Sequence, residues 1–215
     1  MKCYICKRNA QIEEQKNRAI CNECFCRLIE KRVRRYTRTN DVFTPNKRIL
    51  VVGEVNKCLA KSIVGQMPVK LFFSKKIDTD FIKKNKIDSV LIEWTIDDEG
   101  NQFLAKLFKG ESFKKIDKKY KENFEKVSNS QNFRRELCAE SCQKSSFAKF
   151  SVKMLITLTN EEAALFAKIK GIKFEPEKRD LLIKKIIDEV QKEHPGAKHT
   201  LIKNISLLNK LTDKD

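Results

Sequence analysis

The residues best suited to chemistry in this chain are four cysteines near its amino terminus. They form two pairs, Cys3-x-x-Cys6 and Cys21-x-x-Cys24, with fourteen residues between the pairs. Two CxxC pairs at this separation have the spacing of a four-thiolate zinc site. Each pair can form a tight turn that places two sulfur atoms about 2.3 Å from one Zn²⁺, while the intervening segment folds back to bring in the second pair. The sequence therefore predicts a zinc module at Cys3, Cys6, Cys21 and Cys24.

The other four cysteines do not extend this pattern. Cys26 and Cys58 lie in apolar segments and are predicted to be small buried thiols. Cys138 and Cys142 are interpreted as ordinary thiols, although a labile metal or a redox role stays open for them. The first residues form no apolar signal region, and no apolar run reaches the ~20 residues that span a bilayer. We therefore expect a cytoplasmic protein, in which metal binding is favoured over disulfides.

A strong positive charge indicates a polyanionic partner. The chain has 46 lysines and arginines against 29 acidic residues, for a net charge of +17. A basic protein of this size most often binds nucleic acid. The alternative is a lysine-rich composition without a specific partner.

A helix is expected directly after the cysteines, over about residues 24–37. Apolar residues recur on one face of it at helical spacing. The opposite face is basic and has almost no acidic residues among its cations, so intrahelical ion pairs do not account for it. This face is a candidate RNA-binding surface, and a simple solvated face is the alternative. Its residues are Arg27, Lys31, Arg34, Arg35 and Arg38.

Further along the chain, strand and helix patterns alternate, which predicts an α/β domain with a mainly parallel sheet. Residues 159–162 have the character of a capping box that opens a helix through Ile169. Residues 111–150 are charged and poorly patterned, and are expected to be an insertion. We thus expect a zinc module with its basic helix at 1–40 and an α/β domain at 41–215. The expected strands are 48–53, 69–73, 89–94, 152–158 and 172–174, and the expected helices are 57–64, 79–85, 97–110, 159–169, 182–190 and 200–211.

The ordered set of segments resembles the TtuA-type family of cytosolic tRNA 2-thiolation proteins, which includes NcsA. Members begin with CxxC…CxxCF and a helix, followed by a PP-loop domain of the adenine nucleotide alpha hydrolase-like class. The resemblance is carried by Cys21-Asn-Glu-Cys-Phe25, the strand 48–53, the strand and helix within 87–110, the segment 161–174 and His194-Pro-Gly196. It implies a PP-loop fold and a role in thiolation of tRNA.

The same comparison shows which motifs are missing. The family's ATP loop, SGGKDS, is replaced here by Gly53-Glu-Val-Asn-Lys-Cys-Leu59. The family's GHNxDD segment corresponds to residues 93–98 of this chain. Glu93-Trp-Thr95 replaces GHN, and only Asp97 and Asp98 are kept. The family's catalytic cysteines have no counterpart, since residues 74–88 contain no cysteine and the ECP-like segment reads Phe174-Glu175-Pro176. The resemblance therefore implies a degenerate PP-loop domain, with no functional ATP or iron–sulfur site and no catalytic residues.

Three functions follow from these observations. The first is a non-catalytic subunit that supports 2-thiolation of the tRNA wobble uridine by a catalytic PP-loop paralogue. Its partners would be tRNA, that paralogue in a heterodimer and, through the paralogue, a ubiquitin-like sulfur carrier, with no membrane involved. The second is a divergent tRNA sulfurtransferase with a rearranged site built from Lys57, Asp97, Asp98 and the pair Cys138 and Cys142. The third is a zinc-ribbon RNA-binding protein unrelated to thiolation. The missing motifs favour a chain that is not an enzyme by itself.

Overall fold

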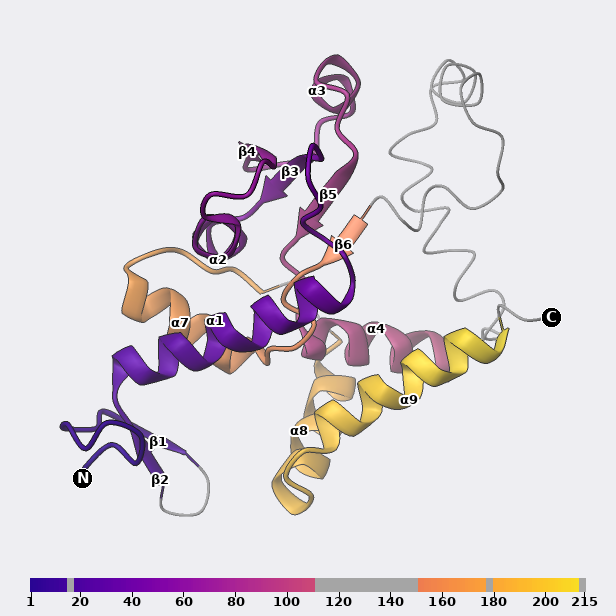
Figure 1. The fold of residues 1–215 in the computed structure, drawn as a ribbon. Helices are drawn as coiled ribbons and strands as arrows, with labels where there is room; N and C mark the ends of the chain where they lie inside the picture. Colours follow the sequence, from indigo (N-terminus) through magenta and orange to yellow (C-terminus); the bar gives the residue numbers. More distant parts are fainter. Residues whose placement is uncertain (15–17, 111–150, 177–179, 213–215) are drawn as a thin grey trace.

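A computed structural model describes residues 1–14, 18–110, 151–176 and 180–212 (Figure 1). The amino-terminal module consists of a hairpin, β1 (Ile12–Glu14) and β2 (Arg18–Ile20), followed by the long helix α1 (Asn22–Thr39). This helix confirms the one expected over 24–37 and is slightly longer. None of the helices in the described ranges is both long and apolar enough to cross a membrane.

A parallel four-stranded sheet forms the centre of the α/β part. Its strands are β3 (Arg48–Val52), β4 (Lys70–Ser74), β5 (Ser89–Ile92) and β6 (Ser151–Lys153), in the order β4-β3-β5-β6. All three neighbouring pairs are parallel, with Leu50 opposite both Phe72 and Val90. The α/β class predicted from the sequence is thus confirmed.

Six further helices lie within the described residues. α2 (Glu54–Val64), α3 (Thr79–Lys84) and α4 (Ile96–Phe108) follow β3, β4 and β5 in turn. α7 (Asn160–Lys170), α8 (Leu181–Glu193) and α9 (Ala197–Thr212) follow β6. α1, α2 and α7 contact one another, and α4, α8 and α9 form a second group (Figure 1).

Alternation along the strands divides the core between the two faces of the sheet. Ile49 and Val51 point to the face covered by α1, α2 and α7, and they belong to one cluster with Ile29 and Val33 of α1. Leu50 faces the other side, where it packs with residues of α3 and β5. The apolar face of α1 is therefore buried in the same core as the sheet, which holds its basic face at a defined orientation. The division of the chain into 1–40 and 41–215 stays a prediction.

Two expected strands are not formed as predicted. β6 ends at Lys153, and the apolar run that follows it folds into turns, in which Ile156 N–H donates to Lys153 O and Leu158 N–H to Leu155 O. Met154, Leu155 and Leu158 are fully buried in these turns. Residues 172–174 form no strand either, because Ile172 N–H donates back to Ala167 O and closes α7. In both cases an apolar run fills the core without joining the sheet.

Helix termini follow the expected capping chemistry. Thr159 and Glu162 form a reciprocal capping box at the start of α7, which ends at Gly171 in the left-handed conformation. Thr95 and Asp98 form a second reciprocal capping box at the start of α4. From the sequence, Asp97 and Asp98 are expected to cap this helix, and of these two Asp98 belongs to the cap. The insertion at 111–150, with Cys138 and Cys142, lies outside the described residues.

Candidate metal centre, basic helix and sheet switch point

The four predicted cysteines converge at one point. Their sulfur atoms all lie within 4.8 Å of one another, and Cys6 Sγ is 3.5 Å from Cys21 Sγ. Cys3 and Cys6 come from the turn before β1, whereas Cys21 is the N-cap of α1 and Cys24 lies in its first turn. Three of the four are buried and Cys6 is half-buried. The structure thus brings together the complete set that the sequence predicted.

Local backbone geometry forms this cluster. Cys3 N–H donates to Arg8 O at 2.7 Å, and Lys7 N–H donates to Cys3 O at 2.9 Å, which closes the first turn. Lys7 has a φ of 65°, in the left-handed region that residues other than glycine adopt rarely. The β1–β2 hairpin pairs Ile12 with Ile20 and so returns the chain to the first turn just before Cys21.

The pKa values of Cys3 and Cys24 are shifted in opposite directions. Burial alone would raise the pKa of Cys3, but backbone N–H groups of Cys6, Cys21 and Ile5 stabilise its thiolate and lower that pKa to about 6. Burial and hydrogen bonding to the other three sulfurs raise the pKa of Cys24 to about 12. A metal ion bound by these cysteines would displace the protons that their thiols carry.

The spacing of the sulfur atoms fits a single four-coordinate ion. Around one zinc ion with Zn–S bonds of about 2.3 Å, tetrahedral geometry places neighbouring sulfurs about 3.8 Å apart. In a [4Fe–4S] cluster each cysteine binds a different iron atom, so the four sulfurs lie farther apart. The present limit of 4.8 Å is close to the mononuclear value. This chain therefore has a four-cysteine metal-binding group.

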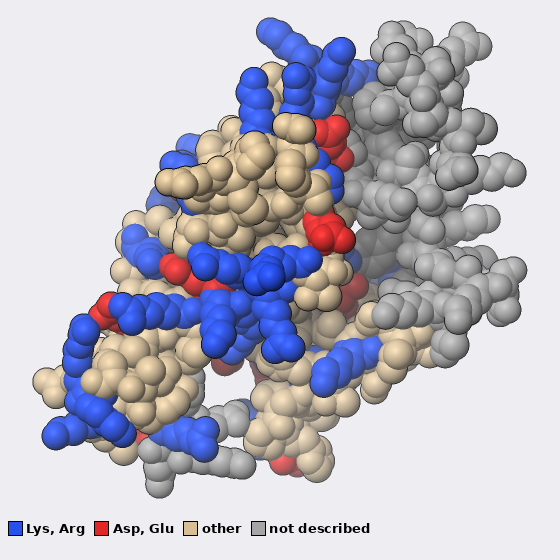
Figure 2. Space-filling view, viewed as in Figure 1, with Lys and Arg blue, Asp and Glu red and all other residues tan. Residues whose placement is uncertain are grey.

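All five predicted basic residues of α1 are exposed, and Figure 2 shows basic side chains gathered over this helix. Arg27 pairs with Glu23 at 2.5 Å, and Arg34 donates to Ser62 O at 3.2 Å. Within the described residues, Lys31, Arg35 and Arg38 form no ion pair. We refer to Arg27, Lys31, Arg34, Arg35 and Arg38 as the basic face. Three of its cations are thus open to an external anion.

Arg32 lies next to the basic face but has a structural role that sequence reasoning missed. Its side chain is half-buried and contacts Glu162 at 2.7 Å, and it also donates to Thr157 O. Since Glu162 is the capping residue of α7, this ion pair ties α1 to α7. The available sequence signal was the position of Arg32 between Ile29 of the apolar face and Arg35 of the basic face, three residues from each.

The carboxyl ends of β3 and β5 meet where the strand order reverses, the switch point at which open α/β sheets bind ligands. α2 begins there, directly after β3, and its first N–H groups would be open to an anion. Instead, Glu93 reaches across from the end of β5, and its Oε1 accepts hydrogen bonds from Val55 N–H at 2.7 Å and Asn56 N–H at 3.2 Å. A carboxylate of the chain itself occupies the anion position.

Gly53 makes this contact possible. It has a φ of +93°, and a Cβ atom there would lie 2.0 Å from Glu93 Cδ. Burial raises the pKa of Glu93, and repulsion from Glu54 adds to this, while the two backbone N–H groups oppose it. Sequence reasoning had recorded Glu93 only as a departure from a family motif. The available signal was an acidic residue at the first position of this motif, where the family has glycine.

Asp97 and Asp98 have structural partners. Asp98 Oδ2 accepts from Thr95 N–H at 2.9 Å within the cap of α4. Asp97 is 4% exposed and pairs with Lys198 of α9 at 2.7 Å, and Lys198 also contacts Asp188 of α8 at 2.8 Å. These ion pairs join α4, α8 and α9, and Lys198 was not identified from the sequence. Lys57, the third described member of the rearranged site considered above, pairs with Glu54 at 3.5 Å.

Cys26 and Cys58 are not part of the metal-binding group. Cys26 is buried as expected and Cys58 is half-buried, and burial raises the pKa of both thiols. Neither therefore has the lowered pKa of a reactive cysteine.

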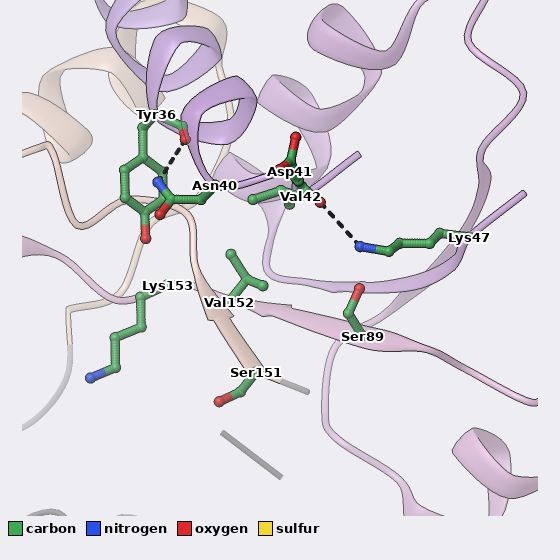
Figure 3. Close-up of a pocket in the computed structure, with 9 residues that line it drawn as sticks. All are labelled: Tyr36, Asn40, Asp41, Val42, Lys47, Ser89, Ser151, Val152 and Lys153. Carbon is green, nitrogen blue, oxygen red and sulfur yellow. Dashed lines mark hydrogen bonds between the residues drawn. The ribbon is translucent and has the colours of Figure 1, made fainter. Parts of the chain in front are cut away.

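A polar pocket of about 600 Å³ lies at the opposite, amino edge of the sheet (Figure 3). Ser89 and Ser151 begin β5 and β6 there, and the end of α1 forms the wall with Tyr36 and Asn40. Ser89 Oγ is buried and has no hydrogen-bond partner among the described residues. The pocket is remote from the switch point, so it is not a counterpart of a nucleotide site.

Comparisons with known proteins agree with this architecture. No family model and no curated protein matches the chain. Among solved structures, the U34-tRNA thiolase NcsA from Methanococcus maripaludis with its [4Fe-4S] cluster is similar, with a TM-score of 0.66 and 16% sequence identity. The match covers 97% of this chain and 87% of that chain. At this identity the likeness concerns the fold, and it confirms the predicted resemblance to TtuA-type proteins at that level.

Proposed function

We propose that this chain is a non-catalytic subunit that supports 2-thiolation of the wobble uridine of tRNA by a catalytic PP-loop paralogue. The fold shared with a U34-tRNA thiolase supports a role connected with tRNA thiolation. The observation that carries the non-catalytic part is the contact of Glu93 with Val55 N–H and Asn56 N–H.

Glu93 acts against nucleotide binding in two ways. Its carboxylate takes the backbone donors that would hold a phosphate, and its negative charge repels one. Glu54, the first residue of α2, adds a second negative charge at the same helix end. Without bound ATP the chain has no means of activating uridine by adenylation. Catalysis therefore falls to the paralogue, which supplies both the nucleotide site and the sulfur chemistry.

In this proposal the basic face provides tRNA binding, and the metal is one structural Zn²⁺ held by Cys3, Cys6, Cys21 and Cys24. Bound zinc would supply no catalytic chemistry there, because four thiolates leave it no open position for substrate. Lys31, Arg35 and Arg38 would contact phosphates, while the core beneath α1 keeps their orientation. The partner chain would also bring the ubiquitin-like sulfur carrier to the complex.

The test combines the chain with candidate PP-loop paralogues by co-expression, followed by thiolation assays on tRNA. We expect one paralogue to co-purify, and we expect the pair to thiolate tRNA while the present chain alone neither binds Mg·ATP nor modifies tRNA. Adenylation or thiolation by the isolated chain would favour the divergent sulfurtransferase. RNA binding without any paralogue partner would favour the zinc-ribbon protein unrelated to thiolation.

A further inference from the structure

An apolar groove of about 920 Å³ lies between α1 and α9. Its floor consists of aliphatic side chains from α4, from the turn after β6 and from α9: Ile96, Ile156, Ile202 and Leu207. Tyr36 of α1 adds an aromatic side chain to the wall. The groove is distinct from the metal-binding group and from the switch point.

The rim of the groove is basic. Arg35 lines it from α1, and Lys203 and His199 line it from α9. No acidic residue is among the described residues that line it, and the charge of the remaining cation, Arg32, is offset by Glu162. Arg35 belongs to both the groove and the basic face, so the basic face borders the groove.

Thr157, in the turn after β6, also lines the groove, although its Oγ1 is buried and does not face the opening. An apolar floor, an aromatic side chain and cations at the rim together match the parts of a nucleotide: a flat base beside a charged phosphate.

We propose that this groove holds an unstacked base of a single-stranded RNA segment. The base packs against Tyr36 and the aliphatic floor, and its flanking phosphates lie at Arg35 and Lys203. A double helix cannot use such a recess, because its bases are stacked and paired. The proposal rests on the proposed function only in taking that RNA to be a tRNA loop; base capture itself does not require a catalytic partner.

Fluorescence anisotropy tests this with the full chain and two labelled RNAs of equal length, an anticodon stem-loop and a fully paired duplex. We expect the stem-loop to bind more tightly. Lys203→Gln should weaken stem-loop binding and lower the slope of log K against log salt by about 0.7 to 0.9. Leu207→Ser should weaken it several-fold without changing that slope, and Tyr36→Leu by about tenfold through lost stacking.

Matched controls come from α8, where Leu182 is exposed and Lys184 is exposed on the same helix. Leu182→Ser and Lys184→Gln make the same chemical changes away from the groove, and neither should alter RNA affinity. Circular dichroism and thermal unfolding check that each variant is folded.

Equal affinity for the duplex and the stem-loop, or groove variants that match their α8 controls, would overturn the proposal. Groove variants that keep RNA affinity but lose a co-purifying paralogue would also overturn it and make the groove a protein-docking surface. Because these measurements use the isolated chain, base capture can hold even if the thiolation assay fails, and the reverse is equally distinguishable.

Discussion

At the scale of single residues, Glu93 has the clearest consequence for function. Its carboxylate replaces an external anion at the start of α2, and the close approach requires glycine at position 53. A half-buried carboxylate with two backbone donors stabilises the helix start in the way that an N-cap side chain does. The same contact that fills the anion position at the start of α2 therefore contributes to stability.

Glu93→Ala is expected to lower the free energy of unfolding by about 1–2 kcal/mol, because two N–H groups lose their acceptor. Urea denaturation measures this. Glu54→Ala is the control, since that side chain lies at the same helix end and is not bonded to either N–H group. Equal losses for the two variants would contradict the role given to Glu93.

The raised pKa of Glu93 adds a pH dependence. Because protonation of this group is easier in the folded chain, its contribution to stability is complete below its ordinary pKa of 4.5 and is lost as pH rises through the higher folded value. The free energy of unfolding of the native chain, minus that of Glu93→Gln, should therefore decrease as pH rises above about 4.5. A difference that stays constant with pH would contradict this sign.

At the scale of elements, helices are joined by charge as well as by apolar packing. Lys198 of α9 is 7% exposed and lies between Asp97 of α4 and Asp188 of α8. Its hydrogen bonds to both aspartates raise its pKa, although burial acts in the opposite direction. Gly100 allows α4 to approach α9 closely, since a Cβ atom there would be 3.1 Å from Leu201.

Replacing Lys198 by Met is expected to destabilise the chain by about 3–5 kcal/mol, because Asp97 would keep a buried charge without its counter-ion. Thermal or urea unfolding measures this, with Lys192→Met on the exposed side of α8 as the control. If Lys198→Met and Lys192→Met unfold alike, the ion pairs do not hold the three helices together.

The position of Cys21 predicts that metal binding and RNA binding depend on each other. Cys21 is both a member of the metal-binding group and the N-cap of α1. Cys21→Ser should abolish the bound metal and weaken RNA binding together, since the helix start loses its anchor. Metal analysis and anisotropy measure the two effects, and Cys58→Ser serves as the control. Unchanged RNA affinity after metal loss would separate the metal from the basic face.

At the scale of the whole molecule, the net charge of +17 is distributed over many surfaces, so charge alone does not locate the partner. α1 has three exposed cations without ion pairs among the described residues, and α8 also has three exposed lysines, Lys184, Lys185 and Lys192. These two sets allow a comparison at identical net charge.

Changing Lys31, Arg35 and Arg38 together to Gln should weaken RNA binding and lower the salt slope by about 2 to 3, as expected for three lost phosphate contacts. The same change at Lys184, Lys185 and Lys192 should leave the slope nearly unchanged. Binding titrations over a range of salt concentrations measure both. Equal slopes for the two triple variants would mean that RNA binding follows total charge and not the basic face.

Much of the architecture could be predicted because its causes are local. The four cysteines are brought together by two short turns and a hairpin, α1 is indicated by apolar spacing, and Thr159 with Glu162 caps a helix that begins one residue away. Strand and helix alternation was sufficient for the α/β class. Where an apolar run could be either a strand or a buried turn, as in residues 154–158, periodicity did not distinguish the two.

What the sequence by itself determined was therefore the metal-binding group, the basic face and the order of the elements. Only the tertiary structure decided that Glu93 meets the start of α2 from 38 positions along the chain, that Lys198 neutralises Asp97, and that α1 and α9 enclose a groove. The physical reason is the range of the interactions. Caps, turns and helical periodicity act between neighbours in sequence, whereas a carboxylate at the end of one strand reaches a helix after another only once the sheet has assembled.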